Sequence, residues 1–232
     1  MSRAAAAAAA PAAALAIAVI LVAGSCTVDD APDVAGGPPL PSPVSSFVIP
    51  SPILAPGPFT REDLAGIVLG RSETPDGTEF APQYSVDQTI DEFASDDEEL
   101  TALRVDGFVL GHITLFVPAG QLDHDAPPVE PGQVFVQGIA GLFETDVGAD
   151  SSLRRYVSTL RAFQLRHEIR IPADGLGDSS EGLRGRADGE PVTIYAWRTA
   201  NLVLVVSGSG EIAPEDVRAL ADLTERRAER VR

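Results

Sequence analysis

The chain contains no lysine, a single cysteine and only three histidines among its 232 residues. Its 17 basic residues are all arginine, 34 residues are acidic, and the formal net charge is −17. Nucleic acids are bound by basic faces, so we expect no nucleic-acid partner. With Cys26 as the only thiol, neither an intrachain disulfide nor a multi-cysteine zinc site is possible. His112, His124 and His167 do not form a zinc-protease motif, and we expect no cofactor.

The first 26 residues have the parts of a secretory signal. Arg3 is the only charge before an apolar stretch over residues 4–24, and the small residue Ser25 directly precedes Cys26. The run Val22-Ala23-Gly24-Ser25-Cys26 resembles a bacterial lipobox. This resemblance implies a signal peptide over residues 1–25 and acylation of Cys26, which becomes the mature N-terminus on the outer face of the cell membrane. An uncleaved membrane anchor and an ordinary cleaved signal are the alternatives.

Residues 26–58 are expected to form a tether between the acylated cysteine and the folded domain. Nine of the 19 prolines of the chain fall between Ala31 and Pro58. Proline favours an extended backbone, so the segment is predicted to be a semi-stiff spacer. The short apolar pieces at residues 47–49 and 53–54 either dock on the domain or belong to a solvated linker.

Residues 59–232 are long enough for one extracytoplasmic domain with its own core. Residues 67–69 are expected to form a strand. Helix starts are predicted at residues whose side chains accept hydrogen bonds from exposed N–H groups. The expected starts are Thr60, the pairs Ser85/Gln88 and Ser95/Glu98, and Asp150, which precedes the apolar helical face of Leu153, Tyr156, Val157, Leu160 and Phe163.

The strand signals favour hairpins. Residues 107–117 and 134–143 form two long extended candidates that we expect to pair antiparallel. Asp188-Gly189 is a hairpin signal, and the apolar run 202–206 is typical of a central strand. A last helix is predicted from Pro214. Successive strands joined by tight turns and bracketed by helices predict a single α+β domain with a mainly antiparallel sheet packed by helices, including a C-terminal helix.

Several of these features occur together in a known kind of protein. Gly107-Phe108, the stretch from Arg198 through Asn201-Leu202-Val203-Leu204-Val205-Val206, and the final helix resemble actinobacterial lipoproteins that carry one α+β domain and have no assigned activity. The resemblance covers roughly residues 60–232. It implies a location and a fold class, and it implies no mechanism.

Two groups of residues are candidate sites. Tyr195 and Trp197 alternate on one face of a predicted strand beside Arg198, and this face either covers a helix or opens as a ligand-binding groove with a cationic edge. The triplet Asp123-His124-Asp125, with Glu130 nearby, offers three donors to a divalent cation in a proline-bounded loop, or it is a solvated polar loop.

These observations lead to two functional hypotheses. The preferred one is a membrane-tethered extracytoplasmic lipoprotein that serves as a non-catalytic binding or accessory module. Its expected partners are the lipid bilayer, through the acyl anchor, and either an envelope protein or a small-molecule ligand. The alternative is an envelope hydrolase or a divalent-metal-dependent enzyme. It would use acids with His124 or His112, and a pocket that gathers at least one histidine and two carboxylates would favour it.

Overall fold

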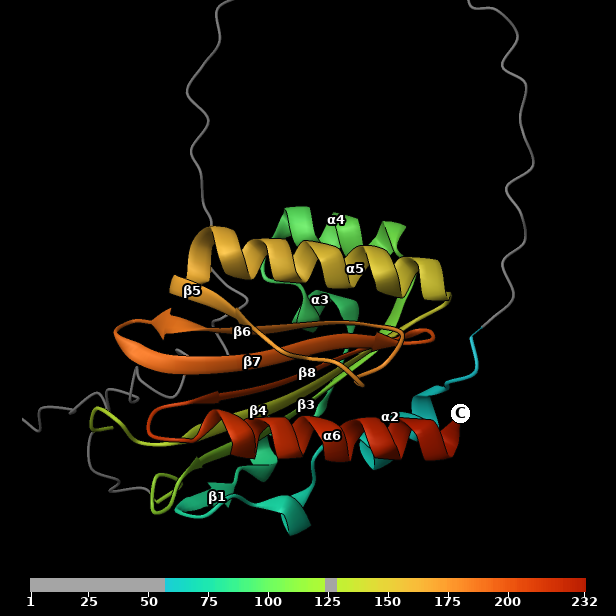
Figure 1. Ribbon diagram of the computed structural model, residues 1–232. Helices are drawn as coiled ribbons and strands as arrows, with labels where there is room; N and C mark the ends of the chain where they lie inside the picture. The colour runs from blue at the N-terminus through green and yellow to red at the C-terminus, as the bar shows by residue number, and fades with distance from the viewer. Residues whose placement is uncertain (1–56, 124–128) are drawn as a thin grey trace, which may run out of the picture.

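Two layers of helices enclose one eight-stranded sheet in which all neighbouring strands are antiparallel (Figure 1). The computed structural model describes residues 57–123 and 129–232. The strands are β1 (Thr78–Phe80), β2 (Asp87–Gln88), β3 (Phe108–Pro118), β4 (Phe135–Phe143), β5 (Arg166–Ile171), β6 (Ser179–Ala187), β7 (Glu190–Thr199) and β8 (Leu202–Ser209). The helices are α2 (Arg61–Ile67), α3 (Ile90–Phe93), α4 (Asp97–Val105), α5 (Asp146–Thr159) and α6 (Pro214–Val231), with short turns η2 (Arg71–Glu73), η3 (Pro82–Tyr84) and η4 (Leu160–Gln164).

The strand order is β1-β3-β4-β8-β7-β6-β5, and the short β2 also pairs with β3. The sheet is therefore built from the β3–β4 hairpin, which β1 and β2 extend, and the β5–β6–β7–β8 meander, joined along β4 and β8. Every residue of these two joining strands is buried. Burial on both faces explains why residues 202–206 are an unbroken apolar run instead of an alternating one.

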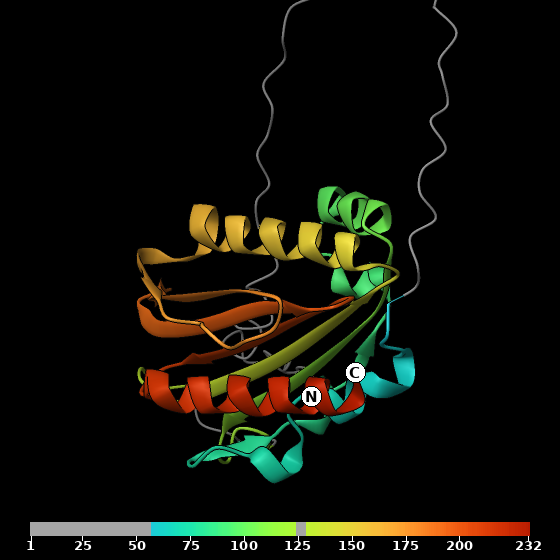
Figure 2. The same ribbon diagram turned by 45° about the vertical axis from the view of Figure 1, so that its right-hand side comes forward.

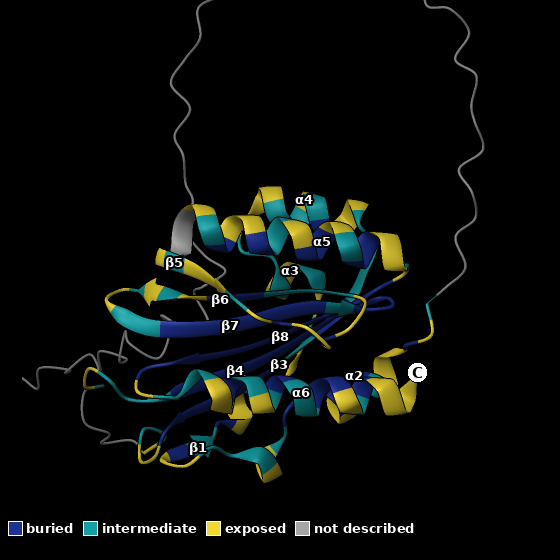
Figure 3. Ribbon diagram, in the orientation of Figure 1, coloured by how far each residue is buried: buried dark blue, intermediate teal, exposed yellow. Residues whose placement is uncertain are grey.

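Each face of the sheet packs against its own helices (Figure 2). The α6 helix packs on β7 and β8, and α2 packs on β3 and β4, over a core that includes Phe116, Trp197 and Leu204. On the other face α5 covers β4, β7 and β8 over a second core that includes Ile139 and Ile194. Burial follows these layers in Figure 3, with the central strands buried and the outer sides of the helices exposed. The fold is a single α+β domain with a C-terminal helix, as the sequence predicted.

The start of α5 packs tightly against the end of α4. A Cβ atom added at Gly148 would lie 1.9 Å from the Asp106 carbonyl oxygen, so only glycine fits at this contact. Beside it, the Arg155 guanidinium donates to the Asp106 carboxylate at 2.6 Å. This contact fixes where α5 begins.

Several local predictions are confirmed. Thr60 is the N-cap of α2, and its N–H and hydroxyl both donate to the Asp63 carboxylate. The β3 and β4 strands pair antiparallel, and Pro214 is the first residue of α6. Asp188 and Gly189 join β6 to β7 with φ values of 51° and 90°, the left-handed conformations that this hairpin turn requires.

Four expectations were wrong. Residues 67–69 are not a strand: Ile67 ends α2, and Val68 and Leu69 are buried irregular backbone. Three helix starts were placed at the wrong residue, because several capping side chains lie close together in each stretch and the tertiary contacts choose among them. Gln88 lies in β2 and the capping box is Thr89/Glu92, Asp96 rather than Ser95 caps α4, and Thr145 rather than Asp150 caps α5.

Candidate functional site

The predicted aromatic face lies under a helix. Tyr195 and Trp197 point to the same side of β7, and both belong to the core that α6 covers. The Trp197 side chain has no exposed surface. Burial raises the pKa of the Tyr195 hydroxyl, and the Arg218 guanidinium lies 5.6 Å from the Tyr195 ring centroid. The face of β7 that carries Tyr195 and Trp197 is therefore covered by a helix and does not open as a groove.

A carboxylate on α6 reaches into this core and binds the tryptophan. The Trp197 Nε1–H donates to Glu225 Oε2 at 2.6 Å, and the Thr199 hydroxyl donates to the same oxygen at 2.7 Å. Glu225 is only 5% exposed. A buried carboxylate must be hydrogen-bonded to be tolerated, so these two bonds fix the distance and rotation of α6 over β7.

Arg198 points to the opposite side of the sheet, toward α5. Its Nη1 lies 3.3 Å from Asp178 Oδ2, and its Nε lies 3.7 Å from Asp150 Oδ1. That Nε is buried and donates no hydrogen bond to any residue described. Ser179 stands opposite Arg198 in the β6–β7 register, and its buried hydroxyl also forms no hydrogen bond with a residue described. Arg198 is therefore held by two acids and is separated from Tyr195 and Trp197 by the thickness of the sheet.

Asp178 connects this corner to the end of α6. Burial alone would raise its pKa, but hydrogen bonds from the Ala200 N–H and Arg232, together with the charges of Arg232 and Arg198, lower the pKa of Asp178 below its ordinary value. The carboxylate is therefore ionised and paired at neutral pH.

The start of the domain is held by one amide side chain. Asn201, 2% exposed, accepts a hydrogen bond from the Phe59 N–H at 3.2 Å. Its Nδ2 donates to the Phe59 carbonyl at 3.3 Å and to the Phe143 carbonyl at 2.8 Å. Next to this cluster the Gly57 N–H donates to the Glu144 carbonyl at 3.3 Å. The backbone from Gly57 to Phe59 is thus fixed to the β7–β8 turn and the end of β4.

A shallow pocket lies at the same place, and we call it the junction pocket. Its volume is about 290 Å³. Its floor is apolar, and its rim carries three charged side chains. The lining residues are Gly57, Phe59, Thr60, Arg61, Glu62, Val109, Leu142, Phe143, Glu144 and Asn201. Pockets for drug-sized ligands start near this volume, so the junction pocket accommodates a small apolar group rather than a whole cofactor.

The predicted metal triplet is only partly described. Asp123 is exposed, whereas His124 and Asp125 lie outside the described residues, so the triplet stays a prediction. In the described ranges no group of three histidine, cysteine or acidic side chains is arranged to hold a metal ion. His112 meets one carboxylate, Asp87, with its Nδ1 at 2.6 Å from Asp87 Oδ1.

Cys26, the predicted lipidation site, and residues 47–49 and 53–54 of the tether also lie outside the described residues. In the part that the structure describes, no helix is long and apolar enough to cross a membrane.

No family model matches the sequence, and no curated protein matches it. Among solved structures, the extracellular domain of PknH from Mycobacterium tuberculosis resembles this chain with a TM-score of 0.46 and 11% sequence identity. The match covers 74% of this chain and 98% of that domain. At this identity and TM-score we draw no functional argument from the likeness.

Sequence reasoning missed the two polar residues that organise the site, Glu225 and Asn201. Glu225 stands four residues after Ala221 and three before Ala228, so it falls on the buried stripe of α6, and this helical spacing was the available signal. Asn201 shows only as a turn residue, because its partner Phe59 is 142 positions away.

Proposed function

We propose that this protein is a membrane-tethered extracytoplasmic lipoprotein, and that residues 59–232 serve as a non-catalytic binding or accessory module. The observation that carries the proposal is Cys26, the only cysteine, directly behind a leader with a positive start, an apolar middle and a small-residue end. Acylation gives this lone thiol a use that an ordinary secreted protein would lack.

The geometry at the start of the domain supports a tether. Asn201 and Glu144 hold the backbone from Gly57 to Phe59, so a segment of about 30 residues behind Cys26 ends at a fixed point of the domain. Such a length spans at most about 100 Å when fully extended. In this proposal the anchor keeps the domain near the membrane without burying its acidic surface in anionic headgroups.

The proposed binding role places the ligand in the junction pocket. The apolar floor formed by Phe59, Leu142 and Phe143 favours an apolar group, and the charged rim formed by Arg61, Glu62 and Glu144 orients a polar end. In this proposal Tyr195 and Trp197 do not contact the ligand, and they position α6 from the core. Arg198 lies outside the pocket, beside Asp150 and Asp178. The partner class is a small apolar ligand or an apolar side chain of an envelope protein.

Anchoring is tested with Cys26→Ser, using Ser45→Ala in the expected tether as the control. We expect the wild-type chain and the control to partition into detergent and to carry a diacylglyceryl mass at residue 26, whereas Cys26→Ser lacks that mass. A wild-type chain that stays in the membrane without that mass would indicate an uncleaved anchor. A soluble wild-type chain with an unmodified thiol would indicate an ordinary signal.

Binding is tested by native mass spectrometry of the full chain released gently from membranes. We expect an added mass on the wild-type chain that is lost in Val109→Trp, because the larger ring fills the junction pocket. Val105→Trp is the matched control, since Val105 is 82% exposed and does not line the pocket. A bare wild-type mass, or an adduct that survives Val109→Trp, contradicts the pocket as the ligand site.

A further inference from the structure

An exposed group of arginines lies on β5 and β6, and we call Arg166, Arg184, Arg186 and Ile169 the arginine surface. All four side chains are exposed, and Ile169 is 55% exposed. In the register of this strand pair Arg166 stands opposite Arg186, and Ile169 stands opposite Arg184. Residues opposite one another in an antiparallel pair point to the same face, so the three arginines share a face with the exposed isoleucine, and the Arg186 guanidinium also donates to the Gly189 carbonyl.

The face that carries them is only partly covered by a helix. Ile171, two residues beyond Ile169, packs against the α6-side core, so the arginine surface is on the α6 side of the sheet. The α6 helix packs on β7 and β8, and the exposed positions begin beyond them on β6 and β5 (Figures 1 and 3). The α6 side of the sheet is therefore covered at β7 and β8 and exposed at β6 and β5, where the arginine surface lies.

The arginines of this surface have no acidic partner. Within residues 57–123 and 129–232, Arg166, Arg184 and Arg186 take part in no ion pair, although eight other arginines do. The acids of β5 and β6, Glu168 and Glu181, both bind Arg161 instead, at 3.1 Å and 3.0 Å. A cationic patch thus persists on a chain with a net charge of −17, and its charge complement is an acidic partner.

The edge of the sheet adds a second observation. The β5 strand is the last in the sheet order, so its outer backbone groups pair with no strand in the described ranges. An open edge accepts an extended peptide as an additional strand, in which main-chain hydrogen bonds give affinity and alternate side chains give specificity. A bilayer offers no such strand, and the acidity of the rest of the chain opposes anionic headgroups.

We infer that the arginine surface docks an extended acidic peptide segment of another envelope protein, which adds to β5 as a further strand. Its carboxylates on every second residue lie on the same face as the arginine surface, where they pair with Arg166 and its neighbours. This surface is separate from the junction pocket, and the inference holds whether or not Cys26 is acylated.

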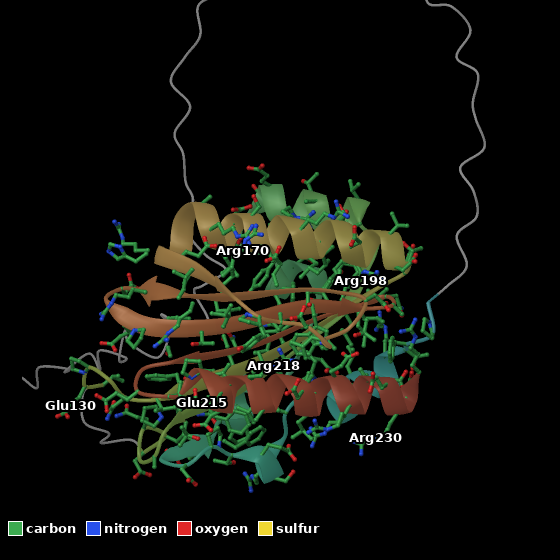
Figure 4. The ribbon with its side chains drawn as sticks, viewed as in Figure 1. Glu130, Arg170, Arg198, Glu215, Arg218 and Arg230 are labelled. Atoms are coloured by element: carbon green, nitrogen blue, oxygen red, sulfur yellow. The ribbon has the colours of Figure 1, made fainter. Side chains whose placement is uncertain are left out.

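The experiment measures binding of a labelled eight-residue peptide of alternating Glu and Val by fluorescence anisotropy, to the chain from residue 27 onward. The double variant Arg166→Glu/Arg184→Glu should weaken binding about tenfold or more. The control Arg226→Glu/Arg230→Glu makes the same charge change at exposed positions of α6, away from β5, and should stay within about twofold of wild type. Figure 4 places Arg230 on α6.

One further peptide and one vesicle decide the outcome. A peptide of the same sequence with a methyl group on every backbone nitrogen cannot donate to the β5 edge, so we expect it to bind about tenfold more weakly. Hydrogen exchange should show protection of β5 amides by the Glu-Val peptide alone. Equal binding of the N-methylated peptide, equal losses in both double variants, or binding of phosphatidylglycerol vesicles in preference to the Glu-Val peptide overturns the proposal.

Charged side chains on an edge strand also prevent two copies of a protein from pairing. This alternative gives a different result. If the wild-type chain does not bind the Glu-Val peptide while Arg166→Glu/Arg184→Glu self-associates in sedimentation, the arginines protect the edge and the docking proposal is wrong.

Discussion

Replacement of Glu225 by alanine should destabilise the domain by about 2–4 kcal/mol. The change leaves the Trp197 Nε1–H and the Thr199 hydroxyl without their acceptor in the core. Each buried donor left unpaired costs about 1–3 kcal/mol. Removing a buried carboxylate also removes its desolvation cost, so the net loss falls below the full sum of two orphaned donors.

The tryptophan itself reports the unfolding. Trp197 is the only tryptophan and has no exposed surface, so its emission shifts to longer wavelength when the core opens. For a domain of this size the urea dependence of the unfolding free energy is about 2 kcal/mol per molar. We therefore expect the urea midpoint of Glu225→Ala to fall by about 1–2 M.

Two variants make the reasoning falsifiable. Glu225→Gln keeps an acceptor oxygen near both donors and should lose only about 1 kcal/mol. Glu229→Ala removes an exposed acid from the same helix and should change stability by less than about 0.5 kcal/mol. If Glu225→Ala matches Glu229→Ala, the hydrogen bonds of Glu225 do not hold α6, and our account of the core is refuted.

Two other predictions concern the junction and the neighbouring corner. Asn201→Ala should lower the unfolding free energy by about 2–3 kcal/mol, because Phe59 and Phe143 lose hydrogen bonds in a buried cluster; an unchanged urea midpoint would contradict this. Since the folded pKa of Asp178 is depressed, its contribution to stability is present above the ordinary value of 3.8 and is lost as the pH falls through the lower folded pKa. As the pH falls from about 5 to 2, the unfolding free energy of Asp178→Asn should therefore decrease less than that of the wild type, as measured by urea titration at each pH. An equal dependence of the unfolding free energy on pH in both proteins would refute the role of Arg232 and Arg198.

The regular parts of the fold could be predicted because their signals are local. The Asp188-Gly189 turn and the proline at position 214 act within a few residues, so the hairpin and the start of α6 follow from the sequence. The start of α5 could not be placed, because Thr145 and Asp150 are both suitable caps. The contact of Gly148 with Asp106, the residue directly after α4, decides between them, and that contact joins distant parts of the chain.

The candidate site was harder to predict for a related reason. Alternation placed Tyr195 and Trp197 on one face correctly, but it does not reveal which helix covers that face. The arginine surface depends on the pairing of β5 with β6, which includes an irregularity between Arg166 and Ile169. No periodic pattern in the sequence specifies such a shift in register.

The seam between β4 and β8 has a consequence for the order of folding. The β3–β4 hairpin and the β6–β7–β8 meander are built from neighbours in sequence, whereas the seam pairs Ile139 with Val205. Closing so long a loop is entropically unfavourable, so non-local pairing forms slowly. We expect both halves to acquire structure first, and a nascent chain to have no complete sheet until β8, its last strand, has emerged.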